Sequence, residues 1–197
     1  MFAEEIELLK RRPGKYLSLG IAADADLRGK PVRVPWEVSA HAYNMKPPDV
    51  YLTPAELHDA GLMAQFQAYH VLGCYVFTPL EDYGFIAGFP ELRDVYIGAG
   101  RNVKDLLFLR GLNGLGMLYL EGAKPVDLEP IYQCSTAAGA FPFLCLCFAD
   151  CEVGDVSALT RVHNISELIV FGRDDDGERA RWGRIPALTH RYYVSRK

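Results

Sequence analysis

The sequence predicts an α/β solenoid, a stack of short units in which strands form a parallel sheet on the concave face and helical or 3₁₀ turns form the convex face. Two observations carry this prediction. A short apolar motif returns at intervals of 20 to 28 residues, and several copies are followed by the same aspartate-containing turn. One such unit cannot bury its own apolar side, so stacking is what builds a continuous core.

The repeated motif has apolar positions three residues apart, followed by one more apolar position after two residues. It is clearest at "ELRDVYIGAG" (91–100) and "GLGMLYLEGA" (114–123), where Val95 and Leu118 hold the same place. Steps of three fit a helical or 3₁₀ turn with one buried face, and the final step of two fits a strand. The expected core-facing strand centres are Val50, Tyr75, Val95, Leu118, Leu146 and Leu168, with a last unit at 192–194.

A second signature follows three of these strands. The stretches "VKDLLFL" (103–109), "PVDLEPI" (125–131) and "EVGDVSAL" (152–159) each contain an aspartate followed by two apolar residues, at Asp105, Asp127 and Asp155. An aspartate at this place caps a short helical turn. The two apolar residues after it predict that the turn packs against the strand layer from the convex side.

These features resemble the leucine-rich repeat family, whose units read L-x-x-L-x-L-x-x-N/C-x-L. Three triplets fill its leucine positions: Leu115-Leu118-Leu120, Phe143-Leu146-Phe148 and Ile165-Leu168-Val170. Cys151 stands at the Asn/Cys position, whereas other units have Ala123 or Gly100 there, which predicts irregular units. The shared aspartate turn is similar to the internalin type of bacterial repeat. The resemblance covers residues 46–197 as six to seven units and implies a non-catalytic scaffold for protein recognition.

Residues 1–45 do not follow the repeat and are expected to cap its N-terminal end. "MFAEEIELLKRR" predicts a short amphipathic helix that ends at Pro13-Gly14. "KYLSLGIA" and "KPVRVPW" predict a hairpin around the turn "DADLRGK". The ends of a solenoid expose apolar faces, so an atypical terminal unit is needed there.

Composition excludes several classes of function. The net charge is −4 and no basic stripe is present, so we expect no nucleic-acid partner. No stretch approaches ~18 uninterrupted apolar residues, so we expect no membrane span, and the N-terminus lacks the apolar core of a signal peptide. Five cysteines without the density of a disulfide scaffold favour a reducing compartment, and hence the cytoplasm.

No residues converge on a catalytic centre in the sequence. The five histidines share no motif with a nucleophile or a carboxylate, and no phosphate-binding or calcium-binding loop has the required spacing. We therefore expect no catalytic residues, no cofactor and no metal. Cys145 and Cys147 leave one alternative open, because they lie about 6.6 Å apart on one side of a strand and permit a small thiol- or metal-dependent enzyme. A self-associating structural protein is the third possibility.

The outward residues of the strands predict the binding surface. Aromatic and methionine side chains are enriched at protein interfaces, and they recur on this face together with two glutamates. The expected concave binding residues are Tyr51, Tyr96, Met117, Tyr119, Glu121, Glu167, Ile169, Phe171 and Tyr193. The partner is an unknown protein. Because the chain ends in a strand, "THRYYVSRK", a homodimer through the C-terminal strand is a further hypothesis.

Overall fold

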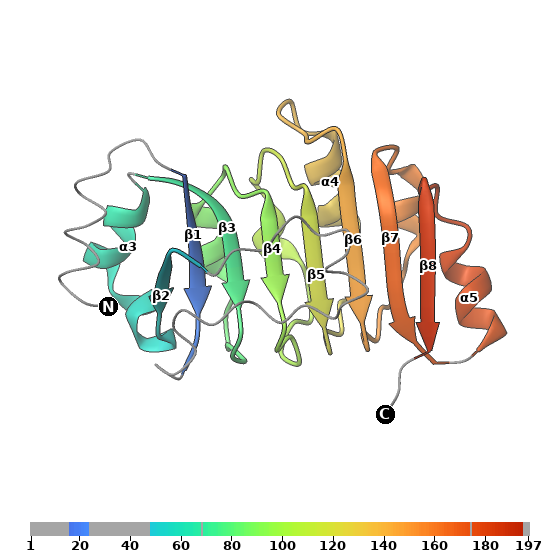
Figure 1. Cartoon of the computed structure of the whole chain (residues 1–197), viewed down its shortest axis with the longest axis horizontal. Helices are drawn as coiled ribbons and strands as arrows, with labels where there is room; N and C mark the ends of the chain where they lie inside the picture. The colour runs from blue at the N-terminus through green and yellow to red at the C-terminus, as the bar shows by residue number, and fades with distance from the viewer. Residues whose placement is uncertain (1–15, 24–47, 68, 174, 195–197) are drawn as a thin grey trace.

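The fold is an α/β solenoid built around one eight-stranded sheet in which every pair of neighbours is parallel. The computed structural model describes residues 16–23, 48–67, 69–173 and 175–194. Figure 1 shows the strands side by side in the order β2-β1-β3-β4-β5-β6-β7-β8. Apart from the exchange of β1 and β2, each strand lies next to the one that follows it in the chain, as the repeat predicts.

The strands are short and the segments between them are short helices. The strands are β1 (Tyr16–Ile21), β2 (Val50–Leu52), β3 (His70–Val76), β4 (Asp94–Ile97), β5 (Met117–Glu121), β6 (Leu144–Ala149), β7 (Ile165–Gly172) and β8 (Thr189–Val194). The 3₁₀ helices are η2 (Pro54–His58), η3 (Gly84–Gly88), η4 (Leu107–Leu109) and η5 (Ser157–Arg161), and the α-helices are α3 (Ala60–Gln67), α4 (Glu129–Thr136) and α5 (Asp176–Trp182).

The core lies between the sheet and these helices. The inward positions of neighbouring strands fall into register, so that one column runs through Leu19, Cys74, Val95, Leu118, Leu146 and Leu168. Each member of this column is at most 1% exposed. Burying a side chain of this size stabilises the fold by about 1.5–3 kcal/mol, so repetition along the column is the main source of stability.

The predicted aspartate turns are confirmed. Oδ1 of Asp105, Asp127 and Asp155 accepts a hydrogen bond from the backbone amide two residues later, at 2.8–3.0 Å. These amides belong to the first turns of η4, α4 and η5, where they lack a partner within the helix. Asp82 makes the same bond to Gly84 at the start of η3, a fourth copy that the sequence pattern missed.

The N-terminal strand differs from the expected hairpin. Both edges of β1 are occupied, by β2 on one side and β3 on the other, and both pairings are parallel. The segment "KYLSLGIA" therefore extends the sheet of the repeats. The predicted helix at 1–12 and the predicted second strand at 30–36 lie outside the described residues, and the boundary at residue 45 and the number of units stay predictions.

The predicted parity of β3 is wrong. Cys74, rather than Tyr75, aligns with Val95, so Cys74 and Val76 face the core and Tyr75 lies on the concave face. The irregular spacing of the early units hid this shift of one residue. Two size effects favour the observed parity: the small Cys74 fits the closed core, and the large Tyr75 ring finds room over Gly73.

The last strand has the predicted parity, with a register that differs by two residues. Arg191 and Tyr193 project from the concave face as expected, but Tyr193 aligns with Phe171 rather than with Ile169.

Candidate binding surface on the concave face

The concave face of the sheet is organised in rows that follow the strand register. The middle row runs Tyr51, Gly20, Tyr75, Tyr96, Tyr119, Cys147, Ile169 and Arg191. One row nearer the strand starts contains Asp94, Met117, Cys145 and Glu167, and one row nearer the strand ends contains Glu121, Ala149, Phe171 and Tyr193. Most side chains predicted for the binding surface therefore occupy neighbouring positions on one face.

Much of this face is buried. Seven residues form a compact group that we call the concave cluster: Tyr75, Tyr96, Met117, Tyr119, Cys147, Ala149 and Ile169. None is more than 7% exposed, and Tyr119 and Ile169 are 1% and 0% exposed. A second buried layer thus lies on the face of the sheet opposite the main core.

The tyrosine rings lie along the sheet instead of standing up from it. A Cβ atom added at Gly98 would lie 2.7 Å from both Cε1 and the hydroxyl of Tyr96, and one at Gly73 would lie 2.8 Å from Cε2 of Tyr75. Each ring therefore covers a glycine two residues away along the chain: Tyr96 covers Gly98, and Tyr75 covers Gly73. Glycine allows this close approach because it carries no side chain.

The rings also contact one another. Tyr96 and Tyr119 are stacked with their centroids 4.5 Å apart and an interplanar angle of 15°, and the Tyr119 hydroxyl donates to Oε2 of Glu121 at 3.1 Å. Burial, followed by the nearby carboxylate of Glu121, raises the pKa of Tyr96. Both rings thus stay neutral, and their burial favours a structural role in the sheet.

The nine predicted binding residues divide into two groups by exposure. Six are buried: Tyr51, Tyr96, Met117, Tyr119, Glu167 and Ile169. The other three keep solvent exposure, since Glu121 is exposed and Phe171 and Tyr193 are half-buried. Sequence alternation identifies the face but gives no information about which side chains on it are covered.

The side chains of this face that keep solvent exposure belong to β5, β7 and β8, and we define an accessible patch of Glu121, Phe171, Arg191 and Tyr193. The rings of Phe171 and Tyr193 stack with centroids 4.9 Å apart. The Arg191 side chain is 32% exposed, and its Nε lies 2.8 Å from Oε1 of Glu167. Hydrogen bonding to Tyr193 and the Glu167 carboxylate raise the pKa of Arg191. The patch therefore combines a rigid aromatic pair with a fixed positive charge.

The cysteines of this face do not have the environment of a reactive thiol. Cys147 is 1% exposed, and Cys145 is half-buried with its Sγ 4.0 Å from Oε2 of Glu167. Burial, and then the charges of Glu167 and Asp94, raise the pKa of Cys145 to about 12. A thiol must lose its proton to act as a nucleophile or metal ligand, and these surroundings oppose that step. Cys74 faces the main core, on the opposite side of the sheet from Cys145 and Cys147.

No group of three or more His, Cys, Asp or Glu side chains within the described segments is arranged to hold a metal ion. No helix among the residues that the structure describes is both long and apolar enough to cross a membrane.

Asp94 is a titratable residue of this face that sequence reasoning did not single out. It aligns with Met117 in the row nearest the strand starts. Burial raises the pKa of its carboxyl group to about 6, against the opposing effect of Arg93. An isolated aspartate at an outward strand position carries no pattern that distinguishes it from a solvated one.

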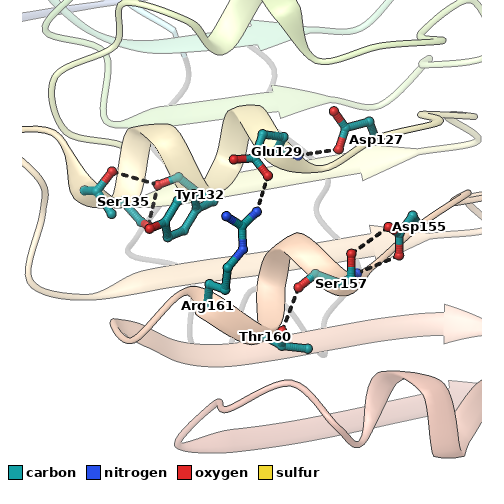
Figure 2. A network of polar contacts seen from close by, with 9 residues as sticks. Asp127, Glu129, Tyr132, Ser135, Asp155, Ser157, Thr160 and Arg161 are labelled. Atoms are coloured by element: carbon teal, nitrogen blue, oxygen red, sulfur yellow. Dashed lines mark hydrogen bonds and ion pairs between the residues drawn. The ribbon is translucent and has the colours of Figure 1, made fainter.

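The convex side carries a polar network between α4 and η5 (Figure 2). Arg161 forms an ion pair with Glu129 and lies over the Tyr132 ring, 4.2 Å from its centroid. Ser157 Oγ donates to Oδ2 of Asp155 at 2.6 Å, next to the capping bond of the same aspartate. Ser157 contacts Asp155 and Thr160, and the Arg161–Glu129 ion pair joins two successive units of the solenoid.

No protein-family model matches the chain, and no curated protein matches it. Among solved structures, the chain is similar to an internalin from Listeria monocytogenes with 18% sequence identity and a TM-score of 0.39. The match covers 87% of this chain and 56% of the internalin chain, so the chain spans little more than half of that protein's length.

The repeat unit itself defines the architecture. Strands at regular intervals align their apolar positions in register, and capped short turns return the chain along the convex side. The described residues thus form a solenoid of stacked strand–turn units, the architecture that the leucine-rich-repeat pattern of the sequence predicts.

Proposed function

We propose that the chain is a non-catalytic protein-binding module that contacts its partner through the accessible patch of Glu121, Phe171, Arg191 and Tyr193. The observation that carries the proposal is the contrast within the concave face. The concave cluster is buried, whereas the stacked Phe171–Tyr193 pair beside it keeps part of its surface exposed.

The chemistry of the patch supports protein recognition. Aromatic residues and arginine dominate the binding energy of protein interfaces, because rigid rings and planar guanidinium groups lose little conformational entropy. Here the two rings are already stacked, and Arg191 is already held by Glu167. A partner would therefore meet side chains that need little ordering, which favours affinity.

The charges of the same face oppose a nucleic-acid partner. Asp94, Glu121 and Glu167 lie on the concave face with Arg191, and the whole chain carries a net charge of −4. Binding to a phosphate backbone needs several converging cations. The alternative of a thiol-dependent enzyme is disfavoured by the raised pKa values of the Cys145 and Cys147 thiols.

Two finer points belong to this proposal. A reducing compartment such as the cytoplasm is part of this proposal, supported by a cysteine content without the density of a disulfide scaffold. A homodimer through β8 is supported by the position of the patch, because Tyr193 lies in the last strand of the sheet.

Site-specific photo-crosslinking tests the proposal. A photoreactive amino acid at Tyr193 should form a discrete adduct with a partner protein in an extract of the source cells. The same group at Tyr16, which is 67% exposed at the other end of the sheet, is the matched control and should form none. Adducts from Tyr16 alone, or equal adducts from both positions, would contradict the proposal.

Substitutions give the energetic counterpart. Phe171→Ala should weaken binding of the captured partner by about 5- to 30-fold, the effect of losing 1–2 kcal/mol at an interface hot spot. Phe143→Ala is the matched control, because Phe143 is 56% exposed just before β6, away from the patch. A larger loss for Phe143→Ala than for Phe171→Ala would place the interface elsewhere.

A further inference from the structure

A cavity of about 640 Å³ lies between the segments that carry η3 and η4. Its lining comes from two successive units, at positions 81–84 and 87 of the first and 102–105, 107 and 108 of the second. Tyr83, Val103 and Phe108 in this lining also belong to the main core, so the cavity is on the convex side, across the sheet from the accessible patch. Its volume is within the range of about 300–1,000 Å³ that is typical of ligand sites.

The seam between α4 and η5 shows which side chains fill such a space elsewhere in the solenoid. There Arg161 forms an ion pair with Glu129 of the preceding unit and lies over the Tyr132 ring, 4.2 Å from its centroid (Figure 2). Glu129 and Tyr132 stand two and five residues after the capping Asp127. Arg161 stands six residues after the capping Asp155.

The same offsets give small residues in the seam between η3 and η4. Two and five residues after the capping Asp82 the chain has Gly84 and Ala87, and both line the cavity. Six residues after the capping Asp105 it has Gly111, where an added Cβ would meet no atom within 4 Å. The cavity therefore lies where the acid, the ring and the arginine of the other seam are replaced by residues too small to fill the space.

The charges around the cavity are mainly negative. Glu81, Asp82 and Asp105 line it, and Lys104 is the one cation among the described lining residues. Oδ1 of Asp82 and Oδ1 of Asp105 accept backbone amides at 2.8 Å and 3.0 Å. A carboxylate has two oxygens and about four lone-pair sites, so each aspartate keeps acceptor capacity beyond its capping bond.

We propose that this cavity binds an arginine side chain of a partner protein, at a site separate from the accessible patch. The guanidinium takes the place that Arg161 has in the other seam. Its fork of donors faces the carboxylates of the lining, as in charge-assisted pairs. The rings of Tyr83 and Phe108, whose centroids are 5.7 Å apart, supply aromatic wall for its planar face.

Apolar side chains near the cavity favour a protein segment over a free cation. Leu107 lines the cavity and is 49% exposed. Val126 is 71% exposed, and its amide donates to the carbonyl of Lys104 at 3.1 Å, which places it beside the lining. These two side chains offer contact surface to apolar residues that flank the arginine of a partner.

Titration of the isotope-labelled full chain with the peptide amide acetyl-Leu-Arg-Leu, followed by amide NMR shifts, tests the proposal. The amides of Gly84 and Leu107, which the two capping aspartates hold, should shift and saturate. The same peptide with neutral citrulline in place of arginine should bind about 3- to 10-fold more weakly, the effect of losing two exposed ion pairs. Equal affinities of the two peptides, or unchanged shifts at both amides, would overturn the proposal.

A double variant separates charge from capping. Asp82→Asn/Asp105→Asn keeps a side-chain oxygen for each cap and removes both charges. It should weaken binding of the arginine peptide by about 3- to 10-fold. Asp127→Asn/Asp155→Asn makes the same change at two capped turns outside the cavity and should leave the affinity unchanged. Equal losses in the two double variants would assign the effect to the caps and overturn the proposal.

Three further arms locate the peptide and identify the occupant. Ala87→Leu fills the cavity without changing a charge and should abolish binding, whereas wild-type affinity in this variant would place the peptide elsewhere. Acetyl-arginine amide should bind more weakly than the tripeptide, and equal affinity would overturn a protein segment as the occupant. Phe171→Ala, in the accessible patch, should leave tripeptide affinity unchanged, so the site and the proposed function can each fail alone.

Discussion

Replacing Gly98 with alanine tests how the concave tyrosines are buried. The added methyl group would lie 2.7 Å from Cε1 and from the hydroxyl of Tyr96. Favourable carbon–carbon contacts lie at about 3.5–4.0 Å, so the ring must move by roughly 1 Å. It has little room to do so, because it stacks on Tyr119 at 4.5 Å and packs against Phe77 at 5.8 Å.

The magnitude follows from two opposing effects. Overpacking of a filled site costs about 1–3 kcal/mol, to which weakened ring stacking contributes. Alanine lowers the conformational entropy of the unfolded chain relative to glycine, which offsets about 0.4–1 kcal/mol. Gly98→Ala should therefore destabilise the protein by about 1–2 kcal/mol.

A double-mutant cycle isolates the contact, measured by urea unfolding followed by circular dichroism. In a Tyr96→Ala background the ring is absent, and Gly98→Ala should become neutral or stabilising by about 0.4–1 kcal/mol. Gly88→Ala is the matched control, because a Cβ there meets only Gln67 Nε2 at an ordinary 3.5 Å. If Gly98→Ala cost the same with and without the Tyr96 ring, the arrangement of rings over glycines would be refuted.

Three further outcomes are expected. Leu118→Ala should lower the free energy of unfolding by about 2–5 kcal/mol in urea titrations, since Leu118 is 0% exposed in the core column; a cost below that of an exposed control such as Leu107→Ala would contradict the assigned face. Cys147→Ser should lower the free energy of unfolding by about 1–3 kcal/mol, because the hydroxyl enters a buried apolar cluster. Cys145→Ser should lower it less, because Glu167 lies beside Cys145 and can accept the new hydrogen bond. Equal losses for the two variants would contradict this difference. Burial raises the pKa of Asp94 to about 6, so its ionisation opposes folding above that pH. Wild-type stability should therefore gain from Asp94 protonation as the pH falls from about 6 to 4. Urea titrations across this pH range should show that Asp94→Asn lacks this gain and is more stable than the wild type at pH 7.

The fold was predictable from the sequence because its units repeat. A core-facing apolar residue that recurs with the same neighbours, as at Val95 and Leu118, fixes both the strand and its inward face. The capping aspartates were predictable for the same reason, since Asp105, Asp127 and Asp155 occupy one place in successive units.

Irregular units set the limit of this reasoning. At β3 the apolar pattern permitted either parity, and the choice depends on how Tyr75 fits over Gly73, a three-dimensional contact with no sequence period. At β1 the position in the sheet depends on pairing with β2 and β3, which are distant in the sequence. The prediction of hairpin geometry there used only local turn signals.

The candidate site was predictable as a face and not as a set of accessible residues. Alternation correctly placed Tyr119, Ile169 and Tyr193 on the concave side. The alternation pattern does not show which of these side chains are buried, because burial depends on neighbouring strands and on ring orientation. The structure was therefore needed to separate the aromatic residues that pack within the face from those that stay accessible to a partner.

The central claim is that the concave face has a buried tyrosine layer and an accessible patch on β5, β7 and β8. Hydroxyl-radical footprinting of the native protein with mass spectrometry measures this directly, residue by residue. We expect Tyr96 and Tyr119 to be protected, Tyr193 and Phe171 to be modified at intermediate rates, and Tyr16, 67% exposed, to be modified fastest. Modification of Tyr119 as fast as that of Tyr193 would contradict the account.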